Sequence, residues 1–183
     1  MILTQTETPT AYPVTRDEVK ANGRITFTTE DTLIDAYIAA ASDAVERDTG
    51  KAWALQTWTA VMDAWPDDDE IVIPMGPVSS VLAITYIDAD GAEQVVDETG
   101  YIVDTVSADC RIKPVDAWPA LSDTYNAVTV EFRVGPVEAP LAIRQAIIML
   151  AQHWYENRAV LADGQDMPLG VKWLLGTHRR MWV

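Results

Sequence analysis

The stretch AVTVEFRVGPVEAPLAIRQAIIMLAQHWYENR, residues 127–158, contains the change of hydrophobic period that decides the class of fold. Over residues 127–135 apolar side chains alternate with polar ones, which is the pattern of a strand with one buried face. From residue 141 onward the apolar residues recur at helical spacing, with Ile143 and Ile147 on one face. The stretch therefore predicts a strand that leads, through a proline-containing link, into a long helix.

The chain before this strand has the pattern of short strands separated by turn residues. The pair Asp90-Gly91 between two apolar runs is a strong signal for a type I′ hairpin. The expected strands cover residues 56–65, 70–74, 80–88, 92–96, 101–105, 110–114 and 127–135. Short strands at this spacing predict an antiparallel structure, either a small sandwich or an open barrel.

Two helices are expected before the β block. Thr15 and Glu18 fit a capping box that starts a short helix, and Gly23 is expected to end it. A longer amphipathic helix should begin after residues 28–29. Residues 1–14, which contain two prolines, are expected to form an extended lead-in.

The predicted fold class is α+β. We expect a small helical bundle of two N-terminal helices and a long C-terminal helix, with an inserted antiparallel β-subdomain and an extended C-terminal arm. The expected parts are the lead-in and N-terminal helices (residues 1–54), the β-subdomain (residues 55–135), the long helix that completes the helical core (residues 136–163) and the docking arm (residues 164–183).

The last segment differs in composition from the rest of the chain. The whole sequence has 13 basic and 28 acidic residues, whereas residues 164–183 have three basic residues and one acidic residue among many large apolar ones. A basic, Trp-bearing terminus suggests an arm that docks on a partner, although folding back onto its own core remains an alternative. The candidate docking residues are Trp173, Leu174, Leu175, Arg179, Arg180 and Trp182. For an arm, deletion of residues 167–183 should abolish docking and leave the melting temperature nearly unchanged.

Composition excludes several function classes. A net charge of −15 argues against a grip on duplex DNA through its phosphates. Cys110 is the only cysteine, which excludes an internal disulfide and a thiol-based metal site. We find no apolar run long enough to span a bilayer and no signal-peptide pattern, so we expect no membrane partner and synthesis in the cytoplasm.

The sequence contains few groups that suggest catalysis. His153 has the setting of an ordinary helical residue, and His178 has no acidic partner nearby in sequence. The run from Asp88 to Gly91 resembles the start of a calcium loop, but Ala92 breaks the series of ligands and the hairpin turn explains the run better. We therefore expect no catalytic residue, no metal and no cofactor.

Four stretches in one order carry a resemblance to a known family. They are VTRDEVKANGRI with TTEDTLIDAYIAAASDAVERDTGKA, then LQTWTAVMDAWPDDDEIVIPMGPVSSVLAITYIDADGAEQVV, then RIKPVDAWPA with NAVTVEFRVG, and last PLAIRQAIIMLAQHWYENR, which is the most distinctive. Together they span approximately residues 14–175. In them the chain resembles the head–tail connector (adaptor) proteins of long-tailed bacteriophages and gene transfer agents.

The resemblance implies a structural protein of the virion neck, at the head–tail junction. Such a protein forms a homo-oligomeric ring, a dodecamer in the virion, under the portal protein. It carries the next neck or tail-completion protein and leaves a channel for DNA, which passes without specific binding. On this interpretation the C-terminal arm docks on the portal, and the polar face of the long helix contacts the neighbouring copy, with Arg144, Gln152 and Glu156 as candidates.

Two other function classes remain open at this stage. A β-sandwich module that binds a glycan or a peptide would use the β block but leaves the flanking helices and the C-terminal segment unexplained. A hydrolase with an unrecognised carboxylate pair is the second alternative, because 28 acidic residues always place some pairs close together.

Overall fold

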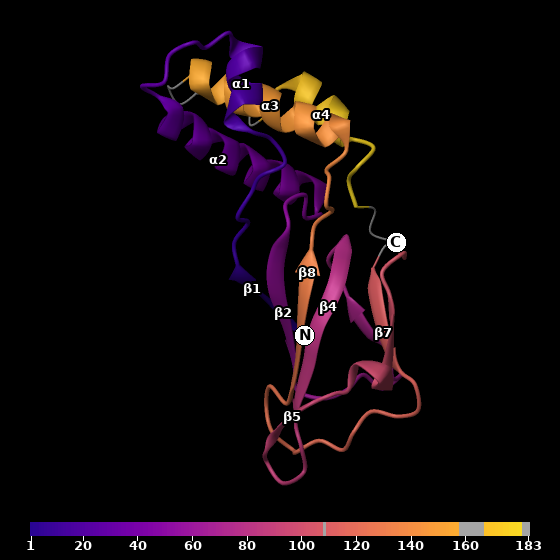
Figure 1. Ribbon diagram of the computed structural model, residues 1–183. Coiled ribbons are helices and arrows are strands. Elements are labelled where there is room, and N and C mark those ends of the chain that lie inside the picture. The colour runs from indigo at the N-terminus through magenta and orange to yellow at the C-terminus, as the bar shows by residue number, and fades with distance from the viewer. Residues whose placement is uncertain (108, 158–166, 181–183) are drawn as a thin grey trace. The chain divides into compact units, whose positions relative to one another are not determined.

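The computed structural model in Figure 1 describes residues 1–107, 109–157 and 167–180. In chain order the elements are β1 (Ile2–Glu7), α1 (Arg16–Gly23), α2 (Asp31–Thr49), β2 (Gln56–Met62), β3 (Ile71–Ile73), β4 (Val78–Ile87), β5 (Glu93–Val95), a 3-10 turn η1 (Glu98–Gly100), β6 (Tyr101–Asp104), β7 (Cys110–Pro114), β8 (Val128–Val134), α3 (Leu141–Glu156) and α4 (Leu169–Leu175). Helices and antiparallel sheets are both present, so the predicted α+β class is confirmed.

The chain divides into two compact units, which are described separately. The β unit consists of residues 1–10 and 55–136. The helical unit consists of residues 11–54 together with the described residues from 137 onward.

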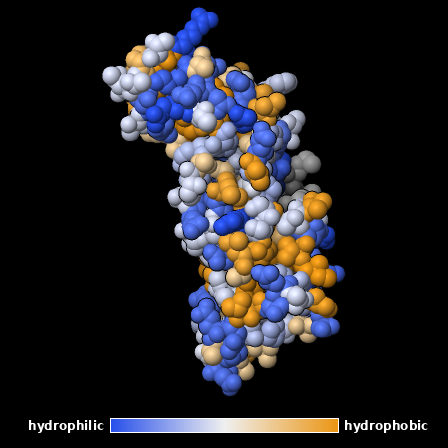
Figure 2. Space-filling model, viewed as in Figure 1, coloured by the Kyte–Doolittle hydropathy of each residue, from blue (hydrophilic) through white to orange (hydrophobic). Residues whose placement is uncertain are grey.

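The β unit contains two antiparallel sheets. The larger has the strand order β1-β2-β8-β4-β5, and the smaller has the order β3-β7-β6. In the central strand β8 every second side chain is buried, and Phe132 lies opposite Trp58 of β2 and Val81 of β4. The smaller sheet buries Ile71, Ile73 and Ile112 completely. Each sheet therefore has one apolar face that must be shielded from water, as in a structure of two packed β layers. Apolar residues also gather on the surface of this unit that faces the viewer (Figure 2).

The expected lead-in contains a strand. β1 pairs with β2 from Ile2 opposite Val61 to Glu7 opposite Thr57, with an irregularity near its end. None of its six side chains is buried, so the sequence has no alternation of buried and exposed positions to mark it. The lead-in is grouped with the N-terminal helices in the prediction, but its first part belongs to the β unit.

The helical unit is built on the contact between α2 and α3, with α1 and α4 packed against them. Apolar residues from all four helices form one core. The members include Val19, Ile34, Ile38, Ala41, Val45, Ile143, Ile147, Leu150, Val171 and Leu175. The i, i+4 spacing that predicted the inner faces of α2 and α3 is thus the spacing that packs them.

The first helix begins as predicted and ends at Gly23, but the left-handed residue that follows the helix is Arg24. The capping box at its start is present, since Thr15 accepts a bond from the Glu18 amide and Glu18 accepts one from the Thr15 amide at 2.8 Å. At its end Arg24, not Gly23, has the left-handed conformation, with φ of 53°. Gly23 lies against α3, where a Cβ atom would be 2.3 Å from the end of the Gln152 side chain and would force that side chain to shift.

The buried face of β8 gives the first testable prediction. Phe132→Ala removes a fully buried ring and should lower the free energy of unfolding by about 3–5 kcal/mol. Val95→Ala is the matched control in the same sheet, because Val95 is 66% exposed, and it should change stability by less than about 0.5 kcal/mol. Chemical denaturation measures both values. Equal effects of the two substitutions would show that β8 does not lie in the core.

Candidate docking surface

The C-terminal segment forms a short helix with apolar residues on both faces. On the inner face of α4, Val171 and Leu175 have no exposed surface. On the outer face, one turn apart, Leu169 is 84% exposed and Trp173 is 81% exposed. α4 lies along α3 (Figure 1), and the two helices approach closely at Gly170, where a Cβ atom would lie 3.2 Å from the Met149 methyl group. The inner face completes the core, and the outer face stays open.

The residues after α4 are fastened to the end of α2. The Arg179 guanidinium binds the Asp48 carboxylate with N–O distances of 3.0 and 2.8 Å. The Arg180 amide donates to the Thr49 carbonyl at 2.8 Å. The His178 ring meets the Trp53 ring edge to face, with centroids 5.7 Å apart. These contacts hold the described part of the C-terminal segment on its own domain.

The prediction of an extended arm was therefore wrong for residues 167–180. Basic residues and tryptophan suggested a free docking segment, but the i, i+4 pair on the inner face of α4 finds its place in the protein's own core. Leu175 is buried and Leu174 is partly buried against the core, so neither offers a large free surface. Trp173 and Arg179 are exposed. Trp182 lies outside the described residues.

All three predicted ring-contact residues make polar contacts within the chain. Arg144 binds the carboxylate of Glu18 on α1 and lies 3.7 Å from that of Glu138. Gln152 is 8% exposed and donates to Glu156 at 2.7 Å. The polar face of α3 looked open in the sequence, but α1 packs against this helix. Glu156 is the candidate that remains exposed.

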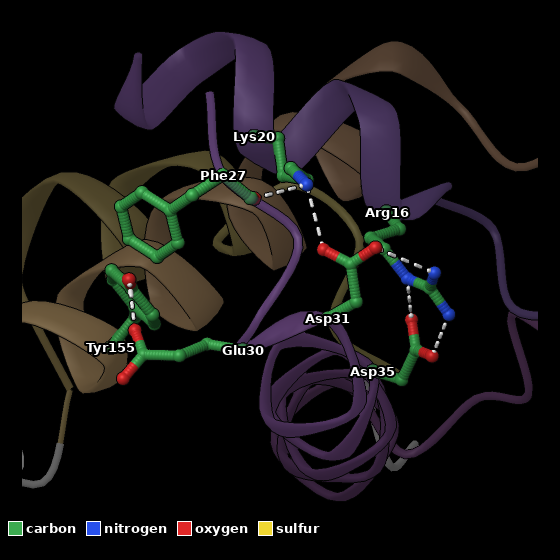
Figure 3. Close-up of polar contacts among 7 residues, drawn as sticks. All are labelled: Arg16, Lys20, Phe27, Glu30, Asp31, Asp35 and Tyr155. Carbon is green, nitrogen blue, oxygen red and sulfur yellow. Dashed lines mark hydrogen bonds and ion pairs between the residues drawn. The ribbon is translucent and has the colours of Figure 1, made fainter. Parts of the chain in front are cut away.

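An ionic cluster joins α1 to the first turn of α2 (Figure 3). The Asp31 carboxylate receives bonds from Lys20 at 2.6 Å and from Arg16 at 3.1 Å, and Arg16 also grips Asp35 in a bidentate pair. Lys20 also donates to the Phe27 carbonyl at 2.6 Å, which closes the loop between the two helices. Hydrogen bonding from Lys20 is the main cause that lowers the pKa of Asp31 below its usual value.

A second polar contact links the end of α3 to the start of α2. The Tyr155 hydroxyl donates to the Glu30 carboxylate at 2.5 Å, as Figure 3 shows, and the Tyr155 ring also meets Tyr37 edge to face at 6.5 Å. Glu30 occupies the N-cap position of α2, where no side-chain capping bond is present. The four helices are thus cross-linked by polar contacts at their ends and by the apolar core between them.

In the β unit, Asp88 serves a turn and Cys110 lies in the interior. Asp88 accepts bonds from the Ala92 and Asp90 amides and from the Gln94 side chain, so its oxygens hold the hairpin turn. Burial raises the pKa of Cys110 to about 11, which leaves the thiol unreactive at neutral pH.

Among the residues that the structure places, no group of three His, Cys, Asp or Glu side chains could hold a metal ion. In those same ranges no helix has the length and apolar character needed to cross a bilayer.

Residues 14–180 match the head completion protein family, and the chain belongs to it. The resemblance to head–tail connectors of phages and gene transfer agents is thereby confirmed.

Three solved structures of gene transfer agent (GTA) particles contain chains similar to this one. Each is 28% identical, and the match covers 100% of this chain and 97% of the other. They come from the neck of an empty GTA particle computed with C6 symmetry, with a TM-score of 0.82, from the virion of a native GTA particle, with 0.80, and from the neck of a native GTA particle computed with C12 symmetry, with 0.74. The comparison with curated proteins gives no match.

The two faces of α4 should respond differently to truncation. Leu175→Ala removes a buried side chain and should lower the free energy of unfolding by about 2–5 kcal/mol. Trp173→Ala, on the outer face of the same helix, should cost less than about 0.5 kcal/mol. Thermal and chemical unfolding of both variants measure this difference. An unchanged free energy of unfolding for Leu175→Ala would show that α4 is not packed in the core and would support the prediction of a free arm.

The carboxylates that hold α1 should make the helical unit sensitive to acid. The hydrogen bond from the Thr15 amide, together with Arg144, lowers the pKa of Glu18 below its usual value of 4.5, and the pKa of Asp31 is also lowered. Groups with a lowered folded pKa stabilise the fold above their unfolded pKa, and this contribution disappears as pH falls through the folded value. The melting temperature should therefore fall between about pH 5 and pH 3. Glu18→Gln should flatten that slope, and an unchanged slope would contradict this role of Glu18.

Proposed function

We propose that this protein is a head–tail connector: a ring-forming subunit of the virion neck that joins the capsid to the tail. The main support is the family match over residues 14–180, together with the similarity of the whole chain to chains from GTA necks and virions. The necks computed with C6 and C12 symmetry favour a closed ring, and we propose twelve copies. Its neighbours would be the portal protein and the next neck or tail-completion protein.

The distribution of charge fits a protein that surrounds DNA without holding it. The β unit has 16 of the 28 acidic residues but only 3 of the 13 basic ones, whereas the helical unit is close to neutral. A surface with so few cations cannot neutralise phosphates and release counterions, so DNA would pass it without being bound. We therefore infer that the channel lets DNA move through during ejection.

The proposed role is structural and involves no catalysis. Its family and its structural neighbours are components of virions. Two tryptophans of the β unit are engaged internally and are not free to stack on a glycan. Trp65 and Trp118 stack at 4.4 Å and donate their indole N–H groups to the Pro119 and Asp69 carbonyls, so they close loops.

The outer face of α4 is the surface that we propose for portal docking. Exposed Trp173 and Leu169 lie one turn apart on a helix whose other face is fixed in the core, and exposed Lys172, next to Trp173 in the sequence, adds positive charge. An apolar anchor with a basic rim suits a partner groove lined by apolar and acidic groups. Glu156 remains our candidate for the contact with the neighbouring copy.

The role in the neck is tested by particles that lack this protein. Full heads should accumulate without tails, and electron microscopy should show necks that end at the portal. Supply of the full chain should restore tail attachment. Complete necks with normally attached tails in the absence of the protein would contradict the connector role.

Portal docking is tested with Trp173→Ala in the full chain. Loss of a central hot-spot tryptophan typically costs about 2 kcal/mol or more of binding free energy, so co-sedimentation with the portal should weaken by about 30-fold or more. Tyr125→Ala is the control, because Tyr125 is an equally exposed aromatic residue (85%) in the β unit and should leave docking unchanged. Equal binding of the portal by both variants would show that the outer face of α4 does not make the portal contact.

A further inference from the structure

Strand β1 contributes edge pairing to the β unit and no buried side chain. It is the outermost strand of the larger sheet and pairs only with β2. Ile2 is 65% exposed, and the other side chains of the strand are exposed or only partly covered. Such a strand is held by its backbone ladder and by polar side-chain contacts. Leu3 is its single partly buried apolar side chain, so apolar packing contributes little to tying the strand to one particular copy.

β2, in contrast, needs a strand beside it. Gln56 and Thr57 are 5% and 3% exposed. Gln5 donates to the Gln56 side chain at 2.5 Å, and the Thr57 hydroxyl donates to Glu7 at 2.8 Å. Without β1 these two bonds and the backbone ladder of β2 would be lost, and an open sheet edge is prone to pair with another strand, so an empty β2 edge is unfavourable. The position beside β2 must be filled, but any copy of β1 can fill it.

The segment after β1 is suited to reach another subunit. Residues 8–14 join the strand, which belongs to the β unit, to the start of the helical unit. Pro9 and Pro13 favour an extended backbone in this segment, and seven extended residues span roughly 25 Å. The range that matches the family starts at residue 14. Strand β1 lies entirely before this range, and the segment 8–14 overlaps it at one residue.

We propose that β1 is an exchangeable strand, which pairs with β2 of a second copy of this chain when the copies assemble. The inference rests on the proposed ring. Exchange keeps every β1–β2 contact and changes only the path of residues 8–14, so it costs little in contacts. In a ring the neighbouring β2 is present at high effective concentration, which favours crossing over. Repeated around a closed ring, one strand from each copy would link all subunits.

Two variants with one added cysteine each test the exchange. Thr4 of β1 lies opposite Thr59 of β2, and neither side chain is buried. Thr4→Cys and Thr59→Cys are produced together, and the assembled particles are oxidised or treated with a short bis-maleimide. Native Cys110 should not react with the oxidant or the bis-maleimide, because it is 2% exposed. A covalent product of one Thr4→Cys chain with one Thr59→Cys chain forms only if β1 crosses to a neighbour.

The double variant T4C/T59C gives a second measurement, with T85C/T129C as its matched control. Thr85 and Thr129 lie opposite each other on β4 and β8, inside one sheet. If β1 is exchanged in the ring, T4C/T59C should give a series of covalent oligomers on a denaturing gel. T85C/T129C should give only monomers. Two results would overturn the exchange: no product from the mixed particles, or closure of T4C/T59C within single chains. Absence of the chain from the particle, measured as its amount per particle, would overturn the proposed function and the exchange with it.

Discussion

The burial of Val171 and Leu175 is the contact on which the helical unit depends. Both side chains are fully buried, and α4 touches α2 as well as α3. Burial of a large aliphatic side chain contributes about 1.5–3 kcal/mol, so the pair accounts for a large share of the 5–15 kcal/mol by which domains are usually stable. The Arg179–Asp48 pair and the Arg180–Thr49 bond then fix the residues that follow. Residues 167–180 are therefore a structural part of the helical unit.

This contact also changes how docking would work. An arm that orders only on binding loses conformational entropy at that moment, whereas a helix already held in the core presents its outer face without that loss. Leu169 and Trp173 owe their exposure to the same helical geometry that buries Val171 and Leu175. A substitution on the inner face would therefore disturb stability and docking together, while one on the outer face would disturb docking alone. The fold thus separates the residues that hold the helix from those that a partner would meet.

The sequence predicted the elements whose side chains follow a clear period. The alternation in β8, the inner faces of α2 and α3 and the capping box at Thr15 all correspond to elements of the structure. It did not predict β1, because a polar edge strand has no buried face to create a pattern. It also misjudged the C-terminal segment and the polar face of α3. Whether Leu175 or Arg144 meets solvent, a partner or another helix depends on α4 and α1 packing there, and these long-range contacts are not encoded in local spacing.

Hydrogen exchange of the free, full-length protein tests the central claim most directly, namely that the C-terminal segment is a folded part of the helical unit. The amide of Gly176 is bonded to the Lys172 carbonyl at 3.1 Å, and the α4 amides after the first turn lie in the same helical ladder. They should exchange as slowly as the amides in the middle of α3, because both helices open only when the shared core opens. Exchange of α4 amides at the rate of an unstructured peptide, with α3 still protected, would show a free arm and contradict the account.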